Sequence, residues 1–337
     1  MQVTLVGIDL AKNIFQVCGV NQSGRSVFNK QVKRAKLMQC LVQYPDAMIA
    51  MEACGGSNYW GRELKKRGMK VMLIPPQHVK PFVKGNKNDR NDAFAITEAA
   101  RRPHLKCVEP KTLDQTDMNQ IHLLLARLVN QRTALINQLR GFMSEYGLVV
   151  SQGKEKLFAA LPGILEDAEN GLTFAARELI ASIINEQHQL NERIKGLEKD
   201  ICLQARASEQ ALRLMQIKGV AERISTAAIA HAGNGAAYKN GRQFSANLGL
   251  VPRENSSGGK QKLGSITKRG NEYLRRLLIQ GAWSVIRYAD TSTDRLSRWA
   301  KQIVERRGKH KAVVAVANKM ARIIWSMLYH QTEYRAG

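Results

Sequence analysis

The sequence has 337 residues and a formal net charge of +24, from 52 lysines and arginines against 28 aspartates and glutamates. This length allows two or three domains with cores of their own, and so large a positive charge favours a polyanionic partner. The basic residues are spread along the whole chain, which argues against membrane binding through one amphipathic helix. The alternative is a basic surface that serves solubility alone.

Neither disulfide bonds nor a zinc site nor a membrane span is predicted. The five cysteines lie far apart, without a Cys-x-x-Cys pair and without zinc spacing to the histidines. The chain begins directly with an expected strand, without a signal peptide. The most apolar late segment, residues 312–328, contains Asn318, Lys319 and Arg322 and therefore reads as a buried helix. We expect a cytoplasmic protein in a cell where that compartment meets DNA.

The first third of the chain predicts an α/β domain with a mixed sheet. Three antiparallel strands are expected within residues 2–32, and alternating helices and strands follow them. The expected elements are strands ending at Asp9 and near 14–20 and 26–32, a helix at 33–43, a strand at 47–52, a helix at 58–67 capped by Ser57, and a strand at 70–74. Residues 77–91 are expected to form a basic loop that suits a phosphate backbone or is merely solvated.

Four carboxylates are placed where they could meet. Asp9 ends a strand that is apolar on both faces, and Glu52 ends a second apolar run. Asp89 and Asp92 share a face if a helix begins there. Because a carboxylate in a dry strand is costly and hard cations prefer oxygen ligands, these acids predict two magnesium ions for phosphodiester chemistry. For any one acid alone, the alternative is a turn or cap residue, with Asp89 as the N-cap.

Two long helices are predicted in the middle of the chain. Apolar residues recur at steps of three and four over 113–146 and over 175–206, with a break at 161–163. A hairpin within one subunit and a dimer-forming coiled coil are equally compatible with this pattern. Residues 211–233 then resemble a helix-hairpin-helix with its turn at Gly219, where backbone N–H groups contact phosphate. Any tight helix pair needs such a glycine.

Residues 245–282 combine serines, glycines and cations. Ser256 and Ser257 lie in a glycine-rich basic loop that leads to a basic amphipathic helix beginning near Asn271. A serine hydroxyl there could attack a phosphodiester while lysines hold the phosphate and its developing charge. From the residues alone, a flexible basic loop with filler serines is the preferred interpretation.

Taken together, these stretches resemble a known family. The motifs are Gly7-Ile8-Asp9, Met51-Glu52-Ala53, the run from Lys87 to Ala93, Gly249-Leu250-Val251-Pro252, Ser256-Ser257-Gly258 and Thr267-Lys268-Arg269-Gly270. Their order is similar to that of the DEDD transposases of bacterial insertion sequences, which are related to the Piv DNA invertases. The resemblance covers nearly the whole chain, and the Ser-Ser-Gly-Gly form is most like the eleven-eleven branch of the one-ten family.

The resemblance implies three regions and a two-part active site. Residues 1–105 would form an RNase H-like (RuvC-like) domain, residues 106–206 a helical coiled-coil region, and residues 207–337 a mainly α C-terminal transposase domain. The acids that would hold Mg²⁺, with two ions per site, are Asp9, Glu52, Asp89 and Asp92. The attacking serine directly precedes a glycine, which corresponds to Ser257, with Ser256 as the alternative.

The resemblance also implies partners. These are double-stranded donor and target DNA, a structured guide RNA encoded by the element, and further copies of the chain in a dimer or tetramer in which acids of one subunit meet the serine of another. The setting is the bacterial cytoplasm, at the nucleoid during action. The candidate nucleic-acid contacts are Lys84, Lys87, Arg90, Lys218, Lys260, Lys262, Lys268, Arg269, Arg275 and Arg276.

The expected function is therefore site-specific DNA recombination. A first alternative is a metal-dependent nuclease of the Holliday-junction type, which uses water as its nucleophile. A second is a non-catalytic scaffold for nucleic acid whose carboxylates only cap helices and pair with lysine and arginine.

Overall fold

The computed structural model describes residues 2–85, 88–103, 105 and 107–335. The chain divides into two compact units, Met1–Asp114 and Gln115–Gly337. The long middle helices and the C-terminal part belong to the same unit, and the division of that part near residue 206 stays a prediction. In the described residues, no helix is both long enough and apolar enough to cross a membrane.

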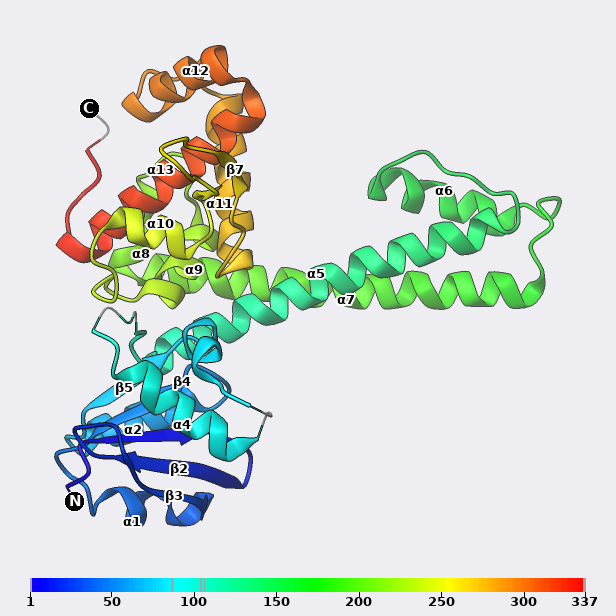
Figure 1. Ribbon diagram of the computed structural model, residues 1–337. Coiled ribbons are helices and arrows are strands. Elements are labelled where there is room, and N and C mark those ends of the chain that lie inside the picture. Colours follow the sequence, from blue (N-terminus) through cyan, green and yellow to red (C-terminus); the bar gives the residue numbers. More distant parts are fainter. Residues whose placement is uncertain (1, 86–87, 104, 106, 336–337) are drawn as a thin grey trace. The chain divides into compact units, whose positions relative to one another are not determined.

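A five-stranded mixed sheet is the centre of the N-terminal unit (Figure 1). The strand order is β3-β2-β1-β4-β5, in which β1 and β3 pair antiparallel with β2, while β4 runs parallel to both β1 and β5. The strands are β1 (Leu5–Asp9), β2 (Ile14–Val20), β3 (Ser26–Lys33), β4 (Met48–Glu52) and β5 (Val71–Ile74). The predicted mixed α/β sheet is confirmed.

Helices cover both faces of this sheet. Val6 and Ile8 of β1 pack with α1 (Leu37–Leu41) and α2 (Ser57–Lys66), whereas Leu5 packs with α4 (Asp89–Ala100) on the opposite face. Successive strand residues point to opposite faces, so a central strand must be apolar on both. That is why β1 reads as a continuous apolar run.

Two local predictions in this unit were wrong, and a third holds with shorter bounds. The helical segment expected at 33–43 is present as a 3₁₀ turn, η1 (Arg34–Lys36), followed directly by α1. Ser57 is not the N-cap of α2, because Gly56 takes that position with φ of +86° and the Ser57 hydroxyl donates to Cys54 O at 2.8 Å. The expected loop at 77–91 contains α3 (Pro76–Val79) and η2 (Lys80–Phe82), since prolines start both turns and Val79 is buried.

Gly7 is where α4 crosses β1. A Cβ added to Gly7 would lie 2.6 Å from Thr97 Cγ2 and 2.7 Å from Ala93 O. We therefore expect Gly7→Ala to lower the free energy of unfolding by about 2 kcal/mol, because α4 must move away from the strand. The measurement is urea unfolding. The matched control is Gly196→Ala in the second long helix, where open space surrounds the glycine and alanine is expected to add about 0.5–1 kcal/mol. A neutral Gly7→Ala would contradict this account.

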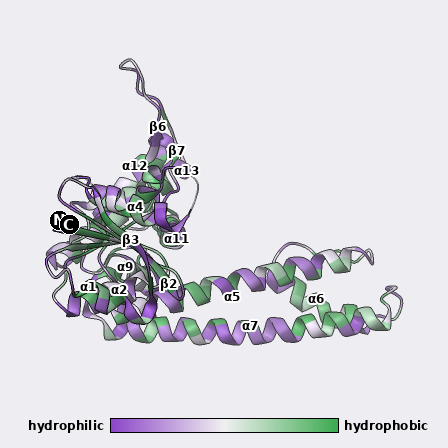
Figure 2. Cartoon of the chain, turned by 60° about the horizontal axis from the view of Figure 1, so that its bottom comes forward, coloured by the Kyte–Doolittle hydropathy of each residue, from purple (hydrophilic) through white to green (hydrophobic). Residues whose placement is uncertain are grey.

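The C-terminal unit begins with a long helical hairpin. Helices α5 (Leu113–Ser144) and α7 (Phe174–Ala207) lie side by side, with α6 (Lys154–Glu166) near their far end (Figures 1 and 2). The hairpin within one chain is confirmed. The break expected at 161–163 is wrong, because these residues lie inside α6, where Leu161 is buried and Pro162 is exposed. Pro162 cannot donate a backbone hydrogen bond within the helix, and the group left without that bond therefore lies on the solvent side.

The remaining helices pack around the buried face of α13. They are α8 (Glu209–Met215), α9 (Glu222–Ala232), α10 (Gly241–Asn247), α11 (Glu272–Arg287), α12 (Arg295–Arg307) and α13 (Lys309–His330). Helices α8 and α9 form the predicted helix pair. Gly219 between them has φ of +80°, and an added Cβ would lie 2.6 Å from Gly281 O of α11. Close helix packing therefore accounts for this glycine without a phosphate.

A buried histidine joins the helical hairpin to the C-terminal helices. His122 of α5 is 2% exposed, and its ring nitrogens lie 3.0 Å from Tyr273 Oη of α11 and 3.0 Å from Thr226 Oγ1 of α9. Burial, and then the positive charge of Arg223, lowers the pKa of His122 to about 4. The folded protein therefore holds this histidine neutral.

This histidine predicts acid sensitivity of the C-terminal unit. In the unfolded chain, His122 is protonated below the ordinary histidine pKa of about 6.5. In the folded chain it is protonated only below a pKa of about 4, so the free energy of unfolding decreases as the pH falls from about 6.5 to about 4. Between pH 7 and pH 5 the expected loss is about 2 kcal/mol in urea unfolding. His122→Gln, which cannot titrate, is expected to remove most of this pH dependence. An equal pH dependence in the variant would contradict the assignment.

Candidate active site

The structure brings Asp9 and Glu52 to the same edge of the sheet. Strands β1 and β4 are parallel neighbours, with Ile8 opposite Met51, so the two acids end adjacent strands. Both are half-buried. Burial first, and then the charges of Glu52 and Asp9, raises the pKa of the Cys54 thiol, which therefore lies in the field of both acids. The two acids therefore lie at the same edge of the sheet, and their role as a metal site stays a prediction.

Asp89 and Asp92 lie in the first turn of α4, as the spacing predicts, and neither is its cap. Asn88 is the N-cap, and its side chain accepts from Asn91 N at 2.8 Å. The alternative interpretation of Asp89 as the N-cap is thus wrong. Asp92 is half-buried and Asp89 is exposed. Carboxylates in a first turn are also favoured by the helix dipole, which gives this pair a structural benefit independent of metal.

Contacts along α4 place its first turn near the end of β1 that carries Asp9. Arg101, just after the helix, lies against Gly24 in the β2–β3 turn, beside the start of β1. At the other end, Arg90 O accepts from Asn29 Nδ2 at 3.0 Å, and Asn29 Oδ1 accepts from Gln16, the residue paired with Asp9. Helix α4 therefore runs antiparallel to β1 and begins beside its acidic end.

The four acids do not form a closed cage. Within the described ranges, no three carboxylate, histidine or cysteine side chains lie close enough to hold one metal ion. Mg²⁺ in nucleic-acid enzymes is usually bound by one or two carboxylates, with waters and substrate phosphates completing its octahedron. The oxygen-only donors of the Asp9–Glu52 pair fit such an open site.

The serine loop is a β-hairpin. Strands β6 (Pro252–Glu254) and β7 (Leu263–Ile266) pair antiparallel, and Figure 2 shows the hairpin extending away from the helices beside it. At its tip, Lys260 N donates to Ser257 O at 3.1 Å, and Gly258 and Gly259 both have positive φ, at 55° and 75°. Two central residues of positive φ are what a two-residue hairpin turn requires. The glycine pair thus forms a hairpin turn at the tip of the predicted serine loop.

The two serines differ in their hydrogen bonds. The Ser256 hydroxyl donates to Glu254 Oε1 at 2.8 Å and accepts from Lys262 N at 3.1 Å, so it helps to hold the hairpin together. Ser257 is exposed, and in the described part of the chain its hydroxyl makes no hydrogen bond. A nucleophile at this tip is therefore more readily supplied by Ser257.

The predicted nucleic-acid contacts divide into exposed and internally engaged residues. Arg275 is 8% exposed and donates to Leu248 O and Arg269 O, so it holds the fold and is a poor candidate for nucleic-acid contact. Lys218 pairs with Asp294 Oδ2 at 3.1 Å, but its side chain is 40% exposed, and its contact with nucleic acid stays a prediction. Lys87 lies outside the described residues. The exposed members are Lys84, Arg90, Lys260, Lys262, Lys268, Arg269 and Arg276.

A polar network that the sequence did not reveal supports the root of the hairpin. His231 Nε2 lies 3.0 Å from Asn247 Oδ1, and its Nδ1 lies 3.2 Å from Asn271 Nδ2, the N-cap of α11. Next to it, a Cβ at Gly249 would lie 2.5 Å from the backbone of Arg269. These residues are far apart in sequence and have no common motif, so only the fold shows that they position the hairpin.

Comparison with known proteins assigns the class. Residues 6–148 match a family model for transposases of the DEDD type, and residues 211–297 match the model described as Transposase IS116/IS110/IS902 family. The first match contains all four acids, and the second contains both serines. The chain is a DNA transposase, an enzyme of DNA recombination.

Relatives along the full chain specify the family. The transposase for insertion sequence element IS1111A of Coxiella burnetii is 42% identical over 99% of this chain and 92% of its own length. A protein of Pseudomonas aeruginosa described as a probable family 20 transposase is 42% identical over 100% of both chains, and the transposase for IS1328 of Yersinia enterocolitica is 36% identical over 96% of both. The chain belongs to the IS110 family of insertion-sequence transposases, consistent with its IS1111 branch.

Proposed function

We propose that this transposase cuts and rejoins DNA through Ser257, with Asp9, Glu52, Asp89 and Asp92 as the acids that bind magnesium in an RNase H-like (RuvC-like) domain. The observation that carries the proposal is the contrast at the hairpin tip, where Ser256 is engaged in hydrogen bonds and Ser257 presents its hydroxyl to solvent. The Asp9–Glu52 pair at one sheet edge supports the assignment of the acids.

Asp9 and Glu52 would provide the first ligands for magnesium, with Asp92 and Asp89 approaching from the first turn of α4. Bound magnesium, with two ions per site, supplies charge neutralisation at the scissile phosphate and at the leaving oxygen. The protein contributes the fixed part of the site, because both strand ends belong to a central sheet and Gly7 lets α4 lie close to it. The repulsion between unneutralised carboxylates favours binding of a cation, and phosphate oxygens can fill the coordination positions that the protein leaves open.

Ser257 performs a transesterification that conserves bond energy. Its Oγ attacks the phosphorus, a serine O–P bond forms, the bond from phosphorus to one deoxyribose oxygen breaks, and that oxygen takes up a proton as the serine hydroxyl loses one. Attack by a sugar hydroxyl on the phosphoserine reverses these changes and joins DNA. Lys260 and Lys262, both exposed near the tip, stabilise the negative charge that develops on the phosphate oxygens.

The proposed partners are donor and target DNA, an element-encoded guide RNA and further copies of the chain, with acids of one subunit meeting the serine of another. The net charge of +24 suits several nucleic-acid strands at once. At the far end of the helical hairpin, Val149 is 84% exposed and Phe174 is 78% exposed. Apolar side chains this open favour a protein contact there in a dimer or tetramer.

The test is to trap a covalent intermediate. The protein is incubated with Mg²⁺, element-end DNA labelled on one strand, and RNA transcribed from the element's ends, and the products are separated under denaturing conditions. We expect a labelled protein–DNA species that is removed by protease and whose linkage maps to Ser257. Cleavage without any such species would support a nuclease that uses water, and neither cleavage nor metal dependence would support a scaffold.

A further inference from the structure

A basic groove lies at the root of the serine hairpin. A hollow of about 740 Å³ has Pro252 and strand β7 on one side and an exposed face of α13 on the other. Asn318 of α13 donates to Leu250 O at 3.1 Å, which fixes the two sides to each other. A second hollow of about 500 Å³, between α10 and α13, shares Lys319 and Arg322 with the first. We call the two hollows together the hairpin-root groove.

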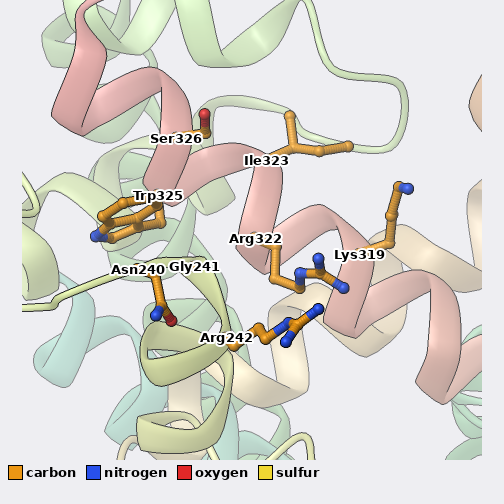
Figure 3. A pocket seen from close by; sticks show the side chains of 8 residues that line it. All are labelled: Asn240, Gly241, Arg242, Lys319, Arg322, Ile323, Trp325 and Ser326. Carbon is orange, nitrogen blue, oxygen red and sulfur yellow. The ribbon is translucent and has the colours of Figure 1, made fainter.

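The cations of the hairpin-root groove have no acidic counterpart within it. Arg242 of α10 and Arg322 of α13 line the same hollow, with Lys319 one turn earlier on α13 (Figure 3). Helix α10 packs against α13 at Gly241, where an added Cβ would lie 3.1 Å from Arg322 Cα. Among the described residues, no carboxylate lines either hollow. Cations gathered in this way repel one another, and a polyanion would relieve that repulsion.

Trp299 adds an aromatic surface to these charges. It is half-buried and lines the larger hollow beside Leu250 and Ile266. Lys319 Nζ lies over its ring, 5.4 Å from the centroid, so a base that stacks on this face takes the place of the Lys319 side chain. A duplex keeps its base faces stacked and presents mainly phosphates, whereas an unpaired strand presents phosphates and base faces together. Cations beside an accessible indole therefore favour an unpaired strand over a duplex.

We propose that the hairpin-root groove binds an unpaired stretch of nucleic acid, with phosphates at Arg242, Lys319 and Arg322 and one base stacked on Trp299. From Pro252 to Ser257 the hairpin extends by five residues, about 17 Å. A strand held at the root can therefore continue to the tip. This last step rests on the proposed function, whereas the binding does not.

Binding is measured on the full chain with EDTA present, so that metal and cleavage play no part. The probes are fluorescein-labelled single-stranded DNA, single-stranded RNA and duplex DNA of one sequence. The variant is Lys319→Glu with Arg322→Glu, and the control of equal charge change is Arg306→Glu with Arg307→Glu, exposed at the end of α12 and outside both hollows. We expect the groove variant to lose at least about tenfold in single-strand affinity and its salt slope to fall by about 1.4.

The fluorescence of Trp299 gives a second measurement, which a general change in charge repulsion would not affect. Single strands are expected to quench tryptophan fluorescence, and Trp299→Phe should remove most of that quenching while it weakens binding by less than about tenfold. Trp325, which lines the smaller hollow and is 8% exposed, accounts for the remainder. Tighter binding of either single-stranded probe than of the duplex supports the proposed groove. Which of the two single-stranded probes, DNA or RNA, binds more tightly identifies the kind of nucleic acid that the groove takes. Preference for the duplex, equal losses in groove variant and control, or unchanged quenching in Trp299→Phe overturns it. Normal single-strand binding without a covalent adduct overturns the proposed serine chemistry and leaves the groove intact.

Discussion

Replacing Ser257 by alanine is expected to abolish covalent attachment to DNA and to lower the rate of strand transfer by about 10⁴-fold or more, because the neighbouring Ser256 hydroxyl is held by Glu254 and Lys262. The fold should survive, since Ser257 is exposed and its turn is set by Gly258 and Gly259. The measurements are the yield of labelled protein–DNA species and single-turnover strand transfer, with DNA binding measured in parallel.

Ser256→Ala is the matched control, one residue away with the same atoms removed. It loses the hydrogen bonds to Glu254 and Lys262, which stabilise an exposed hairpin by about 1 kcal/mol each at most. We expect a modest loss of strand transfer, about tenfold or less, with the adduct still formed. An adduct that persists in Ser257→Ala and disappears in Ser256→Ala would transfer the nucleophile to Ser256.

The positions of the acids in strands and helix were predictable because the signals are local and the geometry is general. Asp9 and Glu52 each follow an apolar run, and adjacent parallel strands bring such ends together wherever the sheet is ordered as it is here. The spacing of Asp89 and Asp92 fixes their shared face once a helix begins. What the sequence did not provide is how closely the acids approach each other, since that depends on how α4 is held through Gly7 and Asn29.

The errors have a common physical cause, which is that tertiary contacts decide what a polar residue does. Arg275 looks like a phosphate contact in the sequence, yet it holds backbone carbonyls in the core. Conversely, Arg242 and Trp299 belong to separate helices with no motif, and only the packing around α13 brings them to one groove. Pro162 reads as a helix end, but its exposed position lets α6 continue.

The charge of the paired acids separates a catalytic role from a structural one. If Asp9 served only the fold, removal of its charge would affect stability and leave the chemistry of the folded protein unchanged. If it holds metal against a phosphate, removal of its charge would stop the chemistry and leave the stability of the folded protein nearly unchanged. Asparagine keeps the size of the side chain, so Asp9→Asn distinguishes the two roles.

Asp9→Asn is expected to lower the rate of strand transfer by about 10³-fold, because a ligand of the catalytic metal loses its charge. The free energy of unfolding should stay within about 1 kcal/mol of wild type, because the substitution removes a like charge beside Glu52. In the Ser257→Ala background, Mg²⁺ should tighten DNA binding, and Asp9→Asn should remove that effect. Asp46→Asn, exposed in the same unit, is the control and should change neither quantity. Full Mg²⁺ dependence in Asp9→Asn would contradict the proposed role of the Asp9 charge in binding the cation.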